Sequence, residues 1–293
     1  MSKRNRAVAL LIVFYLLFFT VFGPFIAPFS LDHSVTVFDY EGTRFYSPFP
    51  PNRVYLLGTD IWGYDLASRI LHGFRYTVFA VVILAGGRVA IGALAGTVAG
   101  YRGFGRRVRR APFAIPAFII VYFVSFRVSI GSPLSIWSLM VLQGSLIVLV
   151  GLPGTIGTFA EETQTIMHHE YIQAARGVGA GPWRIIRRHI FPQLIDLFGQ
   201  QFTGEAVSVL ALLGQLAMFN VFFGGTIVSY DPILYHSRTN ELAGMVGQYR
   251  EYLTTNQWLL LAPLTVYLSI LVSFFVLSRL ATHSSRAKRA RYL

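Results

Sequence analysis

Six long apolar stretches, separated by shorter polar intervals, constrain this chain more than any other feature of its sequence. A membrane-spanning helix needs about 20 consecutive apolar residues. Only 13% of the 293 residues are charged, which is about half the fraction found in soluble domains. We therefore predict an all-α membrane protein with six transmembrane helices. The expected spans are residues 7–29, 76–101, 113–131, 134–158, 194–223 and 256–280.

The positions of the basic residues predict the topology. The intervals expected inside, residues 1–6, 101–112, 161–191 and 279–293, hold 17 of the 25 Lys and Arg residues. This positive-inside asymmetry places both termini in the cytoplasm, and it explains the net charge of +12 without nucleic-acid binding. The first apolar run is longer than a signal-peptide core, and no small-residue cleavage site follows it. We therefore expect it to stay as the first helix.

The first external loop ends with the stretch LGTDIWGYDLASRILHGFRYT. Asp60 and Asp65 each follow a glycine by two residues, and acidic residues near glycines favour turns and helix caps. From Asp65 onward apolar residues recur at helical spacing, with Ser68 and Arg69 between them. This pattern predicts an amphipathic interfacial helix that leads into the second span.

The interval before the fifth span reads EYIQAARGVGAGPWRIIRRHIFP. Good helix formers from Glu170 to Arg176 predict a short helix. Three of the next five residues are glycine, which ends that helix, and Pro182 suits the first position of a second one. We expect the second helix to stop near Pro192. Small residues on one face and arginines on the other are typical of a helix pair that lies at a membrane surface and contacts a partner.

Both stretches resemble the permeases of ABC transporters, in the oligopeptide/dipeptide/nickel subfamily. E-Y-I-x-A-A-R-x-x-G followed by R-H-I-x-P is similar to the EAA loop, although Gln173 stands at its acidic position. The external stretch resembles G-T-D-x-x-G-R-D-x-x-S-R-x-x-x-G-x-R, with Tyr64 replacing an arginine. The matching external residues are Gly58, Thr59, Asp60, Gly63, Asp65, Ser68, Arg69, Gly73 and Arg75. Those of the EAA loop are Glu170, Ala174, Ala175, Arg176, Gly179, Arg188, His189 and Pro192.

The resemblance implies a type I ABC importer permease fold of the C-type subunit. Residues 1–75 would form a transmembrane helix, an external loop and an interfacial helix. Residues 76–293 would form a five-helix core, with a cytoplasmic coupling loop at 161–192 that docks on the ATPase. Ala174, Ala175 and Gly179 would permit close docking, while Glu170 and Arg176 would set its register.

The resemblance also implies the partners and the substrate. The partners would be a homologous permease forming a heterodimer, two ATP-binding subunits, an external substrate-binding protein and the lipid of a bacterial or archaeal cytoplasmic membrane. The chain would form half of a pathway for peptides. A nickel or metal-chelate importer remains the alternative. ATP and Mg would be bound by the partner ATPases, and we expect no cofactor on this chain.

Enzymatic signatures are missing from the sequence. It has no G-x-x-x-x-G-K-[ST] loop, no H-E-x-x-H and no G-x-S-x-G motif, and it has no cysteine. His168 and His169 are adjacent, so on a helix they would point about 100° apart and form a poor metal site. We expect neither catalysis nor a metal. A secondary transporter would need a coupling-ion site and often an inverted repeat, neither of which is evident. A membrane scaffold protein is the remaining rival.

Three charged residues, Arg88, Arg127 and Glu205, lie more than two residues inside the ends of the expected spans. A charge at the bilayer centre costs about 2.5–3.5 kcal/mol or more, so it usually faces protein or a wet cavity. Arg88 and Glu205 both lie near the expected midplane. They would pair with each other, line the pathway or contact the partner permease. Arg127 is expected to snorkel toward the outer interface.

Overall fold

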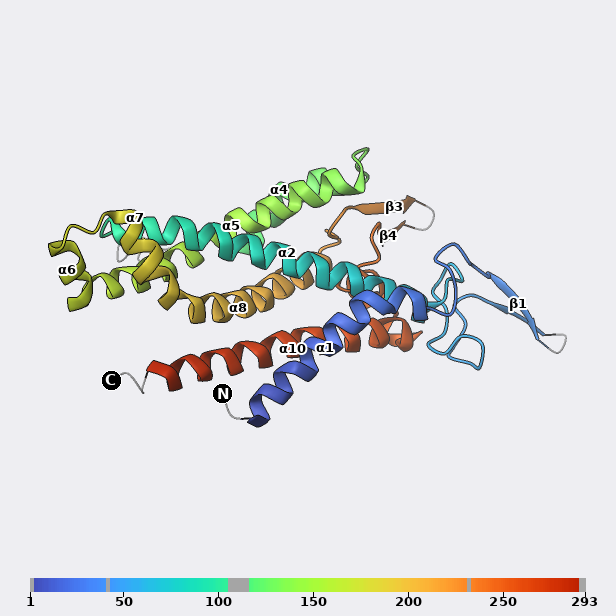
Figure 1. Ribbon diagram of the computed structural model, residues 1–293. Coiled ribbons are helices and arrows are strands. Elements are labelled where there is room, and N and C mark those ends of the chain that lie inside the picture. The colour runs from blue at the N-terminus through green and yellow to red at the C-terminus, as the bar shows by residue number, and fades with distance from the viewer. Residues whose placement is uncertain (1–2, 41–42, 105–115, 231–232, 290–293) are drawn as a thin grey trace.

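Long helices make up most of the protein because a helix satisfies the backbone hydrogen bonds of an apolar run within the run itself. The computed structural model describes residues 3–40, 43–104, 116–230 and 233–289. The helices form an elongated bundle, with β-hairpins at one end (Figure 1). Helices are α1 Lys3–Ile26, α2 Leu66–Tyr101, α4 Ala117–Ser129, α5 Ile136–Met167, α6 Glu170–Gly177, α7 Pro182–Ile185, α8 Phe191–Met218, α9 Leu242–Tyr249 and α10 Gln257–Arg289. A π-helical turn, Ile186–Ile190, precedes α8, and a 3₁₀ turn, Arg250–Thr254, follows α9.

Within the described residues, four helices are long and apolar enough to cross a membrane: α1, α2, α5 and α10. Helix α4 is apolar but has only 13 residues, and the expected start of its span lies outside the described residues. Helix α8 is long enough at 28 residues. It carries polar residues, Asp196 and Glu205 among them, and is not one of the four. The count of six spans stays a prediction.

Helix α2 is the central element of the bundle and packs against α1, α5 and α8. Its 36 residues correspond to a length of about 54 Å, well beyond the hydrocarbon thickness of about 30 Å. The expected interfacial helix is not a separate element, because it forms the first turns of α2. The predicted division between residues 75 and 76 therefore falls inside one continuous helix.

Close packing between α2 and α5 depends on small residues. A Cβ atom at Gly96 would lie 2.6 Å from the Ile156 carbonyl oxygen, and one at Gly100 would lie 2.4 Å from that of Ala160. Both distances are shorter than van der Waals contact, so only glycine lets the two backbones come so near.

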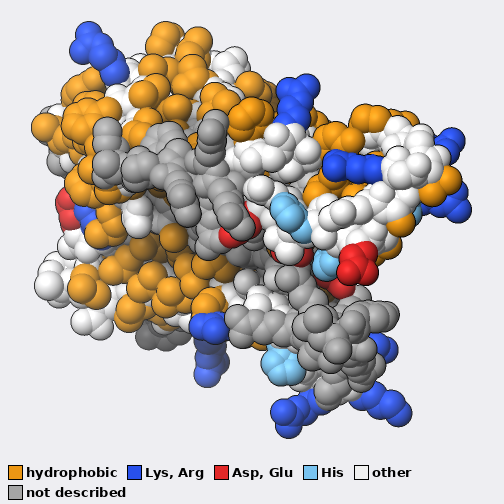
Figure 2. All heavy atoms as spheres, turned by 90° about the vertical axis from the view of Figure 1, so that its left-hand side faces the viewer, with side chains coloured by type: hydrophobic (Ala, Val, Ile, Leu, Met, Phe, Trp, Pro, Cys, Tyr) orange, Lys and Arg blue, Asp and Glu red, His pale blue; other side chains and the backbone are white. Residues whose placement is uncertain are grey.

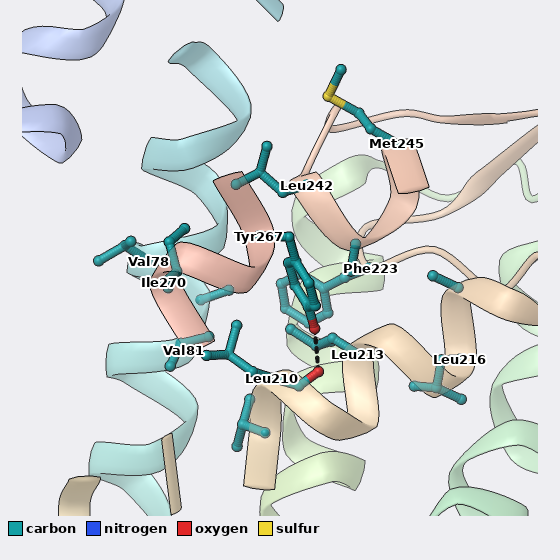
Figure 3. Close-up of a cluster of buried hydrophobic side chains, with 14 of the residues drawn as sticks. Val78, Val81, Leu210, Leu213, Leu216, Phe223, Leu242, Met245, Tyr267 and Ile270 are labelled. Carbon is teal, nitrogen blue, oxygen red and sulfur yellow. Dashed lines mark hydrogen bonds between the residues drawn. The ribbon is translucent and has the colours of Figure 1, made fainter. Parts of the chain in front are cut away.

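The largest apolar core joins α2, α8, α9 and α10 (Figure 3). Within it, Leu210 of α8 lies beside Val81 of α2, and Ile270 of α10 lies beside Val78. Tyr267 of α10 is buried among them, and its hydroxyl donates a hydrogen bond to the Leu210 carbonyl oxygen. The core therefore fixes the C-terminal helix against the centre of the bundle.

Two antiparallel hairpins correct the all-α prediction. They form in the two loops expected to be external, and they lie at the end of the molecule opposite α6 and α7 (Figure 1). One pairs β1 Val37–Tyr40 with β2 Thr43–Tyr46, and the other pairs β3 Thr226–Tyr230 with β4 Ile233–Ser237. The strands have only four or five residues, so the fold remains predominantly helical.

Candidate functional site

The backbone of the coupling loop follows the sequence pattern closely. Helix α6 spans Glu170–Gly177, with Glu170 in its first turn and Arg176 in its last, as the helix dipole favours. Gly179 has a φ of +83°, a conformation that other residues rarely adopt. Pro182 then opens α7. The predicted pair of short helices with a glycine-rich turn is present.

The prediction that the second helix stops near Pro192 is wrong. The chain continues from α7 through the π-helical turn into α8 without leaving a helical path. In a regular α-helix the proline ring would collide with the carbonyl group four residues earlier. Here the Phe191 N–H bonds to the Ile186 carbonyl oxygen, five residues back. Pro192 falls in the first turn of α8, where a missing N–H group is tolerated.

Three fully buried isoleucines anchor the coupling loop to the long helices. Burial of each such side chain stabilises the packed arrangement by about 1.5–3 kcal/mol. Through these contacts α6 and α7 are joined to the ends of three long helices. The isoleucines are Ile172, Ile185 and Ile190, and they pack with Val89 and Ala93 of α2, Phe159, Ile166 and Met167 of α5, and Leu194 and Leu197 of α8.

The opposite face of the coupling loop is exposed. Val178 is 89% exposed and Trp183 is 72% exposed, although both are large apolar residues. Trp183 also borders a surface pocket of about 360 Å³ with Arg184, Arg187 and Arg188. Lys and Arg side chains project around this end of the molecule, between areas of hydrophobic surface (Figure 2). Such a mixed apolar and basic surface is typical of protein contact sites.

Most of the predicted coupling residues lie on this exposed surface, and two of them are half-buried. Val178 and Trp183 were not among the predicted residues. They could have been found in the sequence as large apolar residues close to the glycines of an otherwise polar interval. The exposed predicted residues are Glu170, Ala174, Arg176, Gly179, Arg188 and Pro192, whereas Ala175 and His189 are half-buried.

Two aromatic contacts tie the coupling loop to its surroundings. The guanidinium carbon of Arg176 lies 5.5 Å from the ring centroid of Tyr101, the last residue of α2, within the range of a cation–π contact. The ring of His189 lies 6.1 Å from that of Tyr171, whose hydroxyl accepts a hydrogen bond from the Gln193 side chain. His189 therefore contacts α6 rather than projecting freely.

Arg88 and Glu205 are paired at the centre of the bundle. Arg88 Nη1 donates to Glu205 Oε2 at 2.8 Å, and its Nε and Nη2 donate to the Ile147 carbonyl oxygen at 3.1 and 2.7 Å. The Arg88 side chain is 3% exposed and that of Glu205 is 17% exposed. A Cβ atom at Gly151 would lie 2.2 Å from Arg88 Nε, so glycine there gives the guanidinium its space. One arginine thus links α2, α5 and α8, while Arg127 is exposed on α4.

The external motif forms a buried hydrogen-bonded network. Asp60 forms an ion pair with Arg69 Nη1. Its other oxygen accepts from the N–H groups of Trp62 and Tyr64, both at 2.9 Å. The Tyr249 hydroxyl accepts from Arg69 and donates to Asp60, both at 3.2 Å. The network therefore fixes residues 60–64 and the start of α2 against α9.

Most other motif residues also have structural contacts there. Asp65 caps α2 by accepting a hydrogen bond from the Ser68 backbone N–H at 2.8 Å, as its place shortly after Gly63 predicted. A Cβ atom at Gly73 would lie 2.2 Å from the Asn240 carbonyl oxygen. Arg75 is exposed and lies outside the network. Gly58 and Gly63 have positive φ angles, and Thr59 accepts a hydrogen bond from the Phe49 N–H.

These features define a helical membrane protein whose long helices are rigidly joined to an exposed pair of short helices at one end. Residues 88–287 match the family described as binding-protein-dependent transport system inner membrane component. The chain belongs to this family, and it is therefore a membrane component of a transport system rather than an enzyme.

Curated relatives agree with this assignment. The dipeptide transport system permease protein DppC of Haemophilus influenzae is 28% identical over 290 residues, covering 93% of this chain and 87% of the relative. The oligopeptide transport system permease protein AmiD of Streptococcus pneumoniae is 23% identical over 285 residues, 95% and 84% of the two chains. DppC of Bacillus subtilis is 29% identical over 213 residues, 69% of this chain and 60% of the relative.

Proposed function

We propose that this chain is the permease subunit of an ATP-driven importer and forms half of a translocation pathway for peptides. The observation that carries the proposal is the two-sided coupling loop. One face is buried against α2, α5 and α8, and the other presents Val178 and Trp183. This is the arrangement that a mechanical link between an external motor and membrane helices requires.

The buried isoleucines make the coupling loop a lever. A force applied to its exposed face would move the ends of three long helices together, because packed interfaces shift between discrete arrangements rather than deforming continuously. The continuous path from α7 through the π-helical turn into α8 would carry that movement toward Glu205 and its partner Arg88. Closure of the ATPase dimer would then tilt the bundle between inward-open and outward-open states.

The same proposal assigns the partners and the topology. Six spans would place both termini in the cytoplasm of a bacterial or archaeal cell, and α6 and α7 would contact two ATPase subunits that bind ATP and Mg. A homologous permease would complete the pathway as a heterodimer. The external binding protein would meet the hairpin end. Figure 1 supports this topology, since the start of α1 and the end of α10 lie on the side of α6 and α7, away from the hairpins.

Peptides are favoured over nickel or metal chelates as the substrate. The relatives that align with most of the chain are named as dipeptide or oligopeptide transport proteins. Among the described residues there is also no group of three or more His, Cys, Asp or Glu side chains that could hold a metal ion.

An affinity pull-down from solubilised native membranes tests the proposal. Wild-type protein should recover a second permease and ATPase subunits carrying Walker motifs. Gly179→Trp should lose the ATPases yet remain in the membrane, because no other atom lies within 4 Å of a Cβ at this position and the added ring would project from the docking face. Gly179→Asn is the matched control, since asparagine tolerates a positive φ, and it should keep them.

Two outcomes would contradict the proposal. Recovery of the chain without any ATPase would favour a secondary transporter or a scaffold. Normal peptide uptake by Gly179→Trp would show that the coupling loop is not the lever.

A further inference from the structure

A pocket of about 520 Å³ lies at the hairpin end of the molecule, remote from the coupling loop. Two stretches far apart in the sequence form its walls, residues 34–69 and 227–240. The proposed function gives this pocket no role. The polar and aromatic side chains that line it include Ser34, Trp62, Arg69, His236, Ser237 and Arg238.

The guanidinium group of Arg69 contributes one hydrogen-bonding nitrogen, Nη2, to one wall. Its hydrogen bonds to Asp60 and Tyr249 both use Nη1. Among the described residues Nη2 has no hydrogen-bond partner, and Nε is buried without one. The guanidinium carbon lies 4.3 Å from the Tyr64 ring centroid, so the ring and Asp60 hold the group in a fixed orientation.

Arg238 supplies a second guanidinium. Its Nη1 donates to the Leu134 carbonyl oxygen at 2.8 Å, and it forms no ion pair with a described Asp or Glu. No Asp or Glu is among the residues that line the pocket. Arg238 therefore adds positive charge to a wall on which no described carboxylate lies, and this favours an anionic ligand.

His236 is a further polar side chain of the pocket. Its ring centroid lies 3.8 Å from that of Trp62. Burial, with a further contribution from the Arg69 guanidinium, lowers the pKa of His236 to about 4. The imidazole is therefore neutral near pH 7 and can both donate and accept a hydrogen bond.

We propose that this pocket binds the free carboxylate of a short peptide. Guanidinium groups bind carboxylates through paired, charge-assisted hydrogen bonds, and the volume lies within the range of about 300–1,000 Å³ typical of small-ligand sites. Trp62 and Ile227 offer apolar surface for the peptide's side chains. That the carboxylate belongs to a peptide rests on the proposed function, whereas the binding of a carboxylate rests on the pocket alone.

Tryptophan fluorescence of the full-length protein in detergent tests the proposal. The probes are dialanine, dialanine amide and acetate. Dialanine should give a saturable change, and the amide should bind at least about tenfold more weakly because it leaves the guanidinium donors unpaired. Acetate should also bind about tenfold more weakly, since it lacks the rest of the peptide. These three titrations use only wild-type protein.

Variants locate the binding. Trp62→Phe should abolish the fluorescence change, and Arg238→Gln should weaken dialanine binding at least about tenfold. Arg53→Gln is the matched control, because Arg53 is an exposed arginine of the first external loop that does not line the pocket, and it should leave the affinity unchanged.

Equal binding of dialanine and its amide, or no saturable response, would overturn the proposal. If acetate bound as tightly as dialanine, the proposal that the carboxylate belongs to a peptide would be overturned. That result would point to an acidic side chain of a partner protein. No ATPase takes part in this assay, so its failure is distinct from a failed pull-down.

Discussion

At the scale of single residues, we expect the removal of Arg88 and the removal of Glu205 to destabilise the protein by different amounts. Arg88 is almost fully buried and Glu205 keeps some exposure. Glu205→Ala would leave a buried guanidinium without its carboxylate and should destabilise the protein by about 3 kcal/mol. Arg88→Ala should cost less, because the remaining carboxylate can be hydrated. Thermal unfolding in detergent measures both.

The double variant distinguishes a pair from two independent residues. If the side chains act together, Arg88→Ala/Glu205→Ala should be no less stable, and no less active in peptide uptake, than Glu205→Ala alone. Additive losses in either measurement would show that the contact is incidental.

Glu241 predicts a pH dependence of stability. Burial raises the pKa of Glu241 to about 7, although hydrogen bonds from nearby backbone groups act to lower it. Its Oε2 atom is buried and has no hydrogen-bond partner among the described residues. The fold thus favours the protonated form, so this stabilisation is complete below the ordinary pKa of 4.5 and is lost as the pH rises to about 7. Glu241→Gln should therefore exceed wild type in stability by about 3 kcal/mol near pH 8.5, with a much smaller difference near pH 5.

Unfolding temperatures of the two proteins at these pH values provide the measurement. A constant difference between wild type and Glu241→Gln across the range would mean that Glu241 ionises at its ordinary pKa in the folded protein.

At the scale of elements, the α2–α5 contact depends on glycine at particular turns of α2. Gly96→Ala should lower the unfolding temperature, because its Cβ would overlap the Ile156 carbonyl oxygen and force the helices apart, at about 1–3 kcal/mol. Gly86→Ala is the matched control. Its Cβ would meet only Phe202, at 3.9 Å, so it should be neutral or slightly stabilising through helix propensity. Equal effects of the two substitutions would contradict this account of the packing.

At the scale of the whole molecule, the long axis of the bundle predicts which end faces outward. The chain has no cysteine, so single cysteines can report accessibility without further changes. Tyr230→Cys, at an 82% exposed position in β3, should react with a membrane-impermeant maleimide in intact spheroplasts. Val178→Cys in the coupling loop should react only after permeabilisation. Labelling in the reverse pattern would invert the proposed topology.

Local patterns were sufficient for several elements of this protein. Helix propensity, glycine breaks and Pro182 located α6 and the start of α7, because caps and backbone conformation depend on neighbouring residues. Asp65 was identified as a cap for the same reason. Hydropathy likewise found the four helices α1, α2, α5 and α10, because burial in lipid requires a continuous apolar run.

Other features depended on contacts between distant segments. The π-helical turn that lets the chain pass Pro192 reflects the packing of Ile185 and Ile190 against three helices, and the short hairpins carry no strong alternation of their own. Val178 and Trp183 stand exposed only because the anchoring isoleucines occupy the opposite face.

By itself, then, the sequence determined that this is a helical membrane protein with a short helix pair before its fifth predicted span, since hydropathy and capping act over a few turns. The tertiary structure alone decided that Arg88 bonds to both the Ile147 carbonyl oxygen and Glu205. It also decided that Asp60 and Arg69 both bond to Tyr249, and that Trp62 and His236 line the same pocket. Each of these contacts joins residues separated by many positions in the chain, and only the packing of the helices brings their side chains within bonding distance.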